Sequence, residues 1–342
     1  MSVSNKVTHL LITLVFVASL WPMAIDAQGR GGGADSRNLR GVLGGVPMTA
    51  ADSAIKEVVD LLDFESYKSL IQGLTEFGDR EQGTPRNAAA VDWIEEQLQG
   101  WGYETERLQY MYTPRAGRGA PSPEPEPREE VYATKIGTTN PGEMYIVSAH
   151  MDGRGGGEAA NDDASGTALV MEIARSLASP GVESDMSIRF ALWNNEETGL
   201  NGASAYVEQR AELQGIENPA GAGQYPEPRW LGMIQHDMML WDHGAPRADG
   251  TVSRDQRPEA DFNIEFQSNS VLTDKSMKLA FVFKAAADRY TTDYPATVGP
   301  HMTNTDSTPF MNIVPSISLR ENERGAHTGA GWNPTWHTSL DV

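Results

Sequence analysis

The chain has 342 residues, of which 39% are hydrophobic and 22% are charged, as is typical of a soluble globular protein with a substantial core. Its formal net charge of −20 argues against nucleic acid and anionic membrane surfaces as partners. Cysteine is absent, which excludes disulfides, thiolate ligands and thiol catalysis, so any bound metal must be held by His, Asp and Glu.

The first 27 residues have the pattern of a secretory signal peptide. Residues 10–21 are apolar except for one Thr and one Ser, and small residues then lead to a predicted cleavage after Ala27. A membrane anchor is the alternative, but the run is shorter than the ~20 apolar residues that a spanning helix needs. We therefore expect an exported protein without stable membrane insertion after cleavage. Residues 28–48 are rich in Gly and Arg and predict a flexible linker.

Residues 49–342 are expected to form a single domain. Apolar residues at helical spacing predict helices near residues 55–62, 67–74 and 87–98, with a turn-rich loop containing Arg80 between the last two. A strand is predicted from residue 103 to 111. Residues 112–130 are Pro-rich and too few to form an inserted domain. A hairpin is expected next, with strands 131–137 and 144–149 joined by the turn Asn140-Pro141-Gly142.

The second strand of this hairpin leads into a concentration of polar residues. His150 and Asp152 follow the apolar run directly, and a glycine-rich loop, 153–157, leads to Asn161-Asp162-Asp163 and then to a helical pattern. The carboxyl ends of strands are where α/β sheets place their sites. Three carboxylates grouped with an imidazole are costly unless a positive charge lies among them, and a metal ion is the simplest candidate.

Two later strands end in similar groups. The apolar run 187–193 is followed by Glu196 and Glu197, and the run 230–234 is followed by His236 and Asp237. An edge strand is then predicted over 263–267, a helix over 273–289, an irregular stretch over 291–309 and a last strand over 313–319. The sequence closes on Asn333-Pro334-Thr335-Trp336-His337-Thr338-Ser339-Leu340-Asp341 and ends at Val342.

These motifs, in this order, resemble the M28 family of zinc exopeptidases, which are co-catalytic two-zinc aminopeptidases with carboxypeptidase and glutaminyl cyclase relatives. The resemblance covers about residue 49 to the end. It implies one three-layer α/β domain, with a mixed, mostly parallel twisted sheet and helices on both faces. Relatives usually continue with a further helix after the last motif, and this C-terminal helix is expected to be absent here.

The resemblance also implies a role for each polar residue. Asp162 would bridge two zinc ions, His150 and Asp237 would complete one of them, and Glu197 and His337 would complete the other. Glu196 would be the general base for metal-hydroxide attack on a peptide substrate. Asp152 would accept the second N–H of the His150 imidazole. A cis peptide is expected between Asp162 and Asp163. Further expectations concern residues near the site: His236 packs away from the metals, Tyr294 or His301 stabilises an oxyanion, and Trp332 and Trp336 flank His337.

The predicted function is therefore an exported two-zinc aminopeptidase. A carboxypeptidase or dipeptidase on the same site is the nearest alternative, because the specificity loops cannot be interpreted from sequence. A glutaminyl cyclase works with one metal and does not need the full set of ligands. A metal-free binding module of the same fold is the alternative outside enzymes, and the presence of all five ligands together with Glu196 argues against it.

Overall fold

The structure is a computed structural model that describes residues 49–117, 121–240, 262–290, 296–300, 304–321 and 335–342. The predicted signal peptide and linker, residues 1–48, lie outside these ranges, as do Tyr294, His301 and Trp332. Within the described ranges, no helix is both long enough and apolar enough to cross a membrane.

Three helices precede the sheet, and a side chain caps the start of each. They are α3 (Ala50–Val59), α4 (Phe64–Thr75) and α5 (Pro85–Gly100). Thr49 and Asp52 form a reciprocal capping box at α3, Asp63 caps α4, and Thr84 caps α5. Such caps satisfy backbone N–H groups that have no partner inside the helix. The three helices predicted in this region are confirmed.

Eight strands of the described chain form one sheet, in the order β1-β2-β4-β3-β5-β8-β6-β7. They are β1 (Thr105–Tyr112), β2 (Glu126–Lys135), β3 (Asn140–His150), β4 (Met186–Trp193), β5 (Arg229–His236), β6 (Phe262–Glu265), β7 (Ala296–Gly299) and β8 (Ser316–Arg320). The four central strands, β4, β3, β5 and β8, run parallel to one another. The pairs β1–β2, β2–β4 and β6–β8 are antiparallel, so the sheet is mixed, as predicted.

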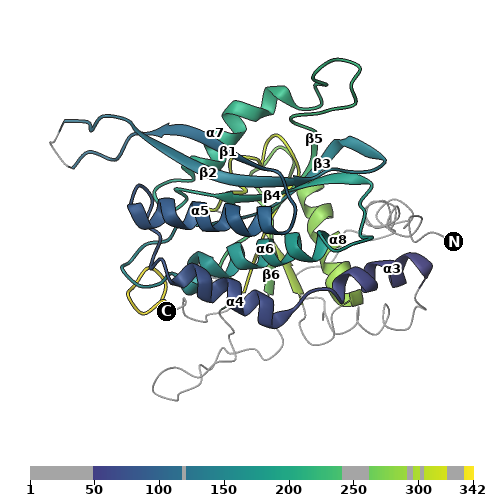
Figure 1. The fold of residues 1–342 in the computed structure, drawn as a ribbon, viewed down its shortest axis with the longest axis horizontal. Coiled ribbons are helices and arrows are strands. Elements are labelled where there is room, and N and C mark those ends of the chain that lie inside the picture. Colours follow the sequence, from purple (N-terminus) through teal and green to yellow (C-terminus); the bar gives the residue numbers. More distant parts are fainter. Residues whose placement is uncertain (1–48, 118–120, 241–261, 291–295, 301–303, 322–334) are drawn as a thin grey trace, which may run out of the picture.

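Helices cover both faces of this sheet, as the three-layer prediction requires (Figure 1). The remaining helical elements are η2 (Ala160–Ser165), α6 (Gly166–Leu177), α7 (Asn201–Arg210), η3 (Ala211–Leu213) and α8 (Thr273–Tyr290). On one face, α4, α5 and α6 pack over Phe190 and Leu192 of β4. On the other face, Tyr206 of α7 packs against Trp193 and Phe310. Helix α8 packs over β5, β6 and β8.

The predicted hairpin between β2 and β3 is wrong. Strand β2 pairs with β1 and β4, and β4 lies between β2 and β3. All eight residues of β4 are buried, so this strand requires a neighbour on each edge and cover on each face. Strand β2 also begins at Glu126, inside the stretch expected to be a Pro-rich loop, and β7 lies within the stretch expected to be irregular.

Candidate metal centre

Loops at the carboxyl ends of the central parallel strands carry most of the predicted site. His150 is the last residue of β3, Glu196 and Glu197 follow β4, and Asp237 follows β5. Asp162 lies in the η2 turn between β3 and α6, and His337 lies in the C-terminal segment 335–342. Neighbouring parallel strands end at the same edge of a sheet, so residues that are far apart in sequence converge there.

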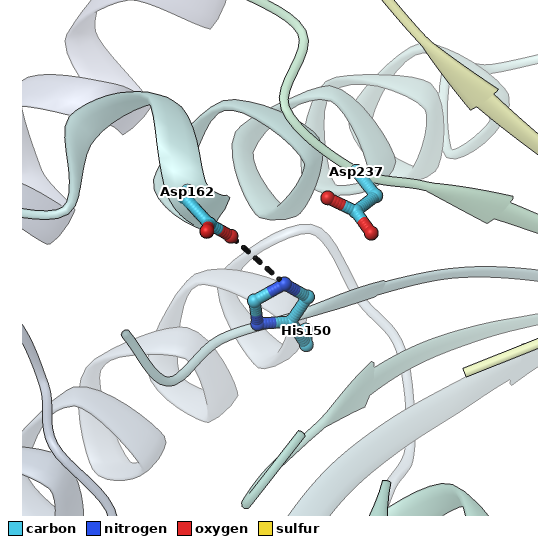
Figure 2. Close-up of side chains that lie close together, drawn as sticks. All are labelled: His150, Asp162 and Asp237. Atoms are coloured by element: carbon cyan, nitrogen blue, oxygen red, sulfur yellow. Dashed lines mark ion pairs between the residues drawn. The ribbon is translucent and has the colours of Figure 1, made fainter. Parts of the chain in front are cut away.

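The five residues predicted to bind metal form two clusters that share Asp162. The ligand atoms of His150, Asp162 and Asp237 all lie within 4.8 Å of one another, and so do those of Asp162, Glu197 and His337. Figure 2 shows the first cluster, in which His150 Nε2 lies 3.2 Å from Asp162 Oδ1. In the second cluster, His337 Nε2 lies 3.1 Å from Asp162 Oδ2. Asp162 therefore presents one oxygen to each cluster.

The electrostatics of these clusters fit a bound divalent cation. Burial raises the pKa of Glu197 to about 7, and the neighbouring Asp162 carboxylate acts in the same direction. The buried Glu197 Oε1 has no hydrogen-bond partner among the described residues. Carboxylates crowded in this way resist ionisation unless a cation is among them. Two His and three carboxylate ligands are also a donor set that zinc accepts.

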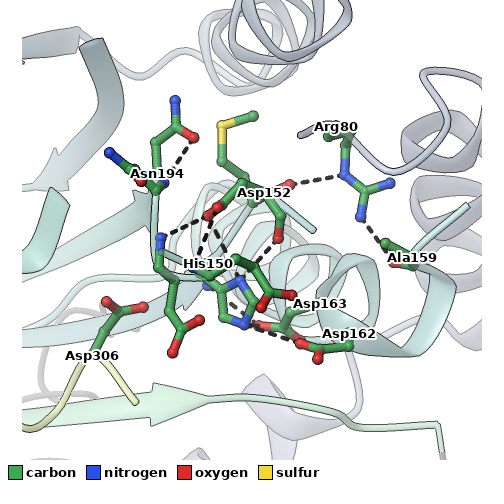
Figure 3. Close-up of polar contacts among 12 residues, drawn as sticks. Arg80, His150, Asp152, Ala159, Asp162, Asp163, Asn194 and Asp306 are labelled. Atoms are coloured by element: carbon green, nitrogen blue, oxygen red, sulfur yellow. Dashed lines mark hydrogen bonds and ion pairs between the residues drawn. The ribbon is translucent and has the colours of Figure 1, made fainter. Parts of the chain in front are cut away.

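Asp152 is buried in the site, but its carboxylate does not make the contact expected of it. The backbone carbonyl of Asp152 lies 2.9 Å from His150 Nδ1, whereas its carboxylate Oδ1 is 3.8 Å from that nitrogen. The carboxylate instead accepts the N–H of Glu196 at 3.0 Å and that of Glu197 at 3.4 Å. Two N–H donors at consecutive residues fit the two oxygens of one carboxylate. Asp152 therefore holds the turn that presents Glu196 and Glu197 (Figure 3).

Asp163 ties together three elements around the site, a role that the sequence did not indicate. Its carboxylate accepts the backbone N–H of His150 at 3.2 Å, of Gly166 at 2.8 Å and of Met238 at 3.1 Å. A Cβ on Gly166 would lie 2.5 Å from this carboxylate, which explains the glycine at the start of α6. The peptide bond between Asp162 and Asp163 is cis, as expected.

Two further buried charged residues at this edge were missed by the sequence analysis. Arg320, the last residue of β8, donates from Nη2 to Asp237 Oδ2 at 2.8 Å and is fully buried. Asp306 is also fully buried (Figure 3), and its carboxylate contributes to raising the pKa of Glu196. Burial raises the pKa of Asp306 well above its usual value. Arg320 could have been noticed as a charge directly after the predicted last strand, 313–319, whereas no sequence pattern marks Asp306.

A cavity of about 500 Å³ opens onto both clusters. Its lining includes Glu196 and Trp336, together with two arginines, Arg115 and Arg154. The Trp336 ring stacks on the His337 imidazole with the ring centroids 3.9 Å apart, as expected for a residue that flanks this ligand. His236 belongs to neither cluster. It is buried, and its Nδ1 lies 3.2 Å from the carbonyl oxygen of Ser148.

Comparison with known proteins shows the family of the chain. The profile of peptidase family M28 matches residues 131–342. A protein of Pyrenophora tritici-repentis described as a probable zinc metalloprotease is 30% identical over 174 residues, which cover 46% of this chain and 35% of that protein. The chain spans only about 35–40% of the length of the first curated relatives that it matches.

Solved structures share the fold. An aminopeptidase from Aneurinibacillus sp. strain AM-1 matches with a TM-score of 0.57 at 17% identity, covering 83% of this chain and 89% of that one. A glutaminyl cyclase from Porphyromonas gingivalis matches with a TM-score of 0.54 at 23% identity, covering 83% and 91%. The profile match extends over more than half of the chain, and the predicted family is confirmed. The chain belongs to peptidase family M28.

Proposed function

We propose that this chain is an exported, two-zinc exopeptidase that removes the N-terminal residue from peptides. The observation that carries the proposal is the pair of three-residue clusters that share Asp162, with Glu196 beside them at the same sheet edge. Aminopeptidases are among the proteins of similar fold, and a curated relative is described as a probable zinc metalloprotease. Export rests on the signal pattern of residues 1–27.

Each cluster would hold one zinc ion, with Asp162 between them. His150 and Asp237 would complete the first zinc site, and Glu197 and His337 the second. When bound, such ions polarise the scissile carbonyl and make water a stronger nucleophile at neutral pH. Residues outside the two clusters hold the ligands in position. Asp152 holds the backbone of Glu197, Arg320 holds Asp237, and Asp163 holds the backbone of His150.

Glu196 would move the proton in this proposal. It is the one carboxylate lining the cavity that belongs to neither ligand cluster within the described part of the chain. Burial raises the pKa of Glu196 well above its usual value, and the carboxylates of Asp306 and Asp237 act in the same direction. A carboxylate of raised pKa is an effective base near neutral pH. Glu196 would accept a proton from the attacking water and deliver it to the nitrogen of the leaving amine.

A carboxypeptidase or dipeptidase is the second candidate, and the arginines of the cavity favour it. Arg154 donates to the carbonyl oxygen of Glu197 at 3.3 Å, and Arg115 Nη2 lies 4.0 Å from the position of a Cβ built on Gly199. Both guanidinium groups therefore lie against the turn that carries Glu196. Guanidinium groups bind carboxylates well, and the free carboxylate of a short substrate could be bound here.

The test combines zinc content with hydrolysis of a panel of free, N-blocked and C-blocked substrates. We expect two zinc ions per chain and turnover of free-amine substrates only. Glu196→Gln should keep both ions and lose about 10²–10⁴-fold in kcat, because an amide cannot accept the proton. Glu143→Gln, a change at a partly exposed residue of β3 outside the cavity, is the control and should leave kcat unchanged.

Other outcomes point elsewhere. Turnover that requires a free C-terminal carboxylate, and that falls in Arg115→Ala or Arg154→Ala, would indicate the carboxypeptidase or dipeptidase. Absence of zinc binding in the wild type would refute the metallopeptidase proposal altogether.

Export is tested separately, by the intact mass of the mature chain. A chain that begins at Gln28 in the culture medium or periplasm would support export. Retention of residues 1–27 in the cytoplasm would contradict it.

A further inference from the structure

The C-terminal segment 335–342 lies directly on the glycine-rich loop that follows β3. A Cβ built on Gly155 would lie 2.6 Å from the carbonyl carbon of His337, and one on Gly157 would lie 2.9 Å from the carbonyl oxygens of Thr338 and Asp341. These distances are shorter than real Cβ contacts. The loop therefore needs glycine at these two positions because the C-terminal backbone occupies the space where side chains would be.

Asp341 makes the polar contacts of this segment. Its Oδ1 accepts the backbone N–H of Asn161 at 2.8 Å, and its Oδ2 accepts the backbone N–H of Asp162 at 3.1 Å. The backbone carbonyl of Asp341 also accepts the N–H of Glu158 at 2.8 Å. The Asp341 side chain is buried. Both oxygens of one carboxylate are thus used by consecutive N–H groups, and such charge-assisted bonds have a defined geometry.

Arg80 holds the same loop through its carbonyl groups. The guanidinium donates to Met151 O, Glu158 O and Ala159 O, each at 2.8 Å, and it is fully buried. Figure 3 shows the bond from Arg80 to Ala159. The chain between His150 and Asp162 is therefore fixed by a buried cation on its carbonyl groups and by a buried carboxylate on its N–H groups. The peptide that bears the shared ligand is the part held by Asp341.

We infer that Asp341 is a positioning residue for the metal centre. It fixes the peptide of Asp162, and because it lies four residues after His337, it also seats His337 against the glycine-rich loop. The placement of the shared ligand and of the last ligand is thereby coupled through one short segment. This inference rests on the proposed function, in which Asp162 and His337 hold zinc. Asp341 belongs to neither ligand cluster, and its carboxylate is taken up by the two N–H groups.

The experiment measures zinc affinity of the full chain by competition with a chelator, using zinc alone as the probe. Asp341→Asn places an NH₂ group against one of the two N–H donors, so the peptide of Asp162 should lose its orientation. We expect zinc affinity to fall about 10–100-fold, as on loss of other residues that orient ligands. Saturating zinc should restore part of kcat, with KM little changed. Circular dichroism at the assay temperature establishes that the variant is folded.

Gly157→Ala provides a second variant that keeps the Asp341 carboxylate. The added Cβ would collide with the carbonyl oxygens of Thr338 and Asp341, so it should displace the segment and weaken zinc binding as Asp341→Asn does. Gly100→Ala is the matched control, because a Cβ there meets nothing within 4 Å. Asp185→Asn is the control for the loss of a buried carboxylate far from the site. The Asp185 carboxylate accepts a hydrogen bond from the Thr139 hydroxyl. Replacing this carboxylate by an amide should lower the free energy of unfolding without changing zinc affinity.

The outcomes separate this inference from the proposed function. If Asp341→Asn or Gly157→Ala is folded and binds zinc as tightly as the wild type, Asp341 serves stability alone and the inference fails, while the two-zinc proposal stands. If Asp185→Asn weakens zinc binding as much as Asp341→Asn does, the effect is not specific to positioning and the inference fails as well. If the wild type itself binds no zinc, both are overturned.

Discussion

The ion pair between Arg320 and Asp237 gives a sharp test of how the site is built. Arg320 is fully buried, its Nη2 lies 2.8 Å from Asp237 Oδ2, and its Nε lies 3.8 Å from Glu265 Oε2. Burial works against its charge, but the carboxylates of Asp237 and Glu265 outweigh burial and raise the pKa of Arg320. Arg320→Met keeps much of the side-chain volume and removes the charge. Two buried carboxylates then lose their cation.

The magnitude follows from the separation of the charges. At 2.8 Å and an effective dielectric constant of about 20, the attraction between Arg320 and Asp237 is about 6 kcal/mol before desolvation is counted. Breaking a buried pair by removing one partner typically costs about 3–5 kcal/mol. We expect Arg320→Met to lower the free energy of unfolding by this amount. At about 2 °C per kcal/mol for a domain of this size, the melting temperature should fall by about 6–10 °C.

The assay is thermal and urea denaturation in the presence of a chelator, so that bound metal does not contribute. Arg229→Met is the matched control. Arg229 also lies on the sheet and forms an ion pair with Glu143, but its side chain is 60% exposed. Exposed pairs of this kind contribute at most about 1 kcal/mol. Equal losses of stability in Arg320→Met and Arg229→Met would refute the argument that burial gives the Arg320 pair its importance.

Two further predictions concern parts of the fold away from the ligands. Phe310→Ala removes a fully buried ring that packs on Trp193. It should lower the free energy of unfolding, measured by urea denaturation, by about 3–5 kcal/mol. The control is Phe64→Ala, because the Phe64 side chain is 70% exposed, and it should change the free energy of unfolding by less than about 0.5 kcal/mol. Burial opposes ionisation of Glu172, but hydrogen bonds from Arg175, from Ser66 and from the backbone N–H of Asp63 outweigh it and lower the pKa of Glu172. This stabilisation is therefore present above the unfolded pKa of about 4.3 and is lost as the pH falls through the lower folded pKa. Glu172→Gln should cost about 1–3 kcal/mol at pH 7 and flatten the loss of stability between about pH 5 and pH 3. If the free energy of unfolding falls between about pH 5 and pH 3 as steeply in Glu172→Gln as in the wild type, Glu172 does not contribute to acid denaturation in this way.

Much of the site could be predicted because its residues follow recognisable strands. His150, Glu196 and Asp237 each lie within three residues of the end of a short apolar run. Polar residues at the carboxyl ends of neighbouring parallel strands lie close together, because these strands end at the same edge of the sheet. The resemblance to family M28 implied the assignment of the five proposed ligands, including Asp162 and His337, and the structure brings the five side chains into two clusters.

Strand pairing was not predictable in the same way. A short turn between β2 and β3 favoured a hairpin, since consecutive strands often pair. The insertion of β4 between them depends on the burial of all eight of its residues, and that burial is a property of the assembled sheet. Local sequence specifies that β4 is a strand and that it is apolar. Which edges it occupies depends on helices and strands far away in the chain.

The amino-acid sequence by itself determined the residue types of the site, their order and the family to which the chain belongs. Only the tertiary structure decided which atoms hold those residues in place. The Asp152 carboxylate turned to the N–H groups of Glu196 and Glu197, Asp341 took the N–H groups of Asn161 and Asp162, and Arg320 reached Asp237. These contacts join segments separated by up to 180 positions. The physical reason is that a buried polar group needs a hydrogen-bond partner, and the fold can supply that partner from a distant segment. The spacing of residues in the sequence does not indicate which segment that is.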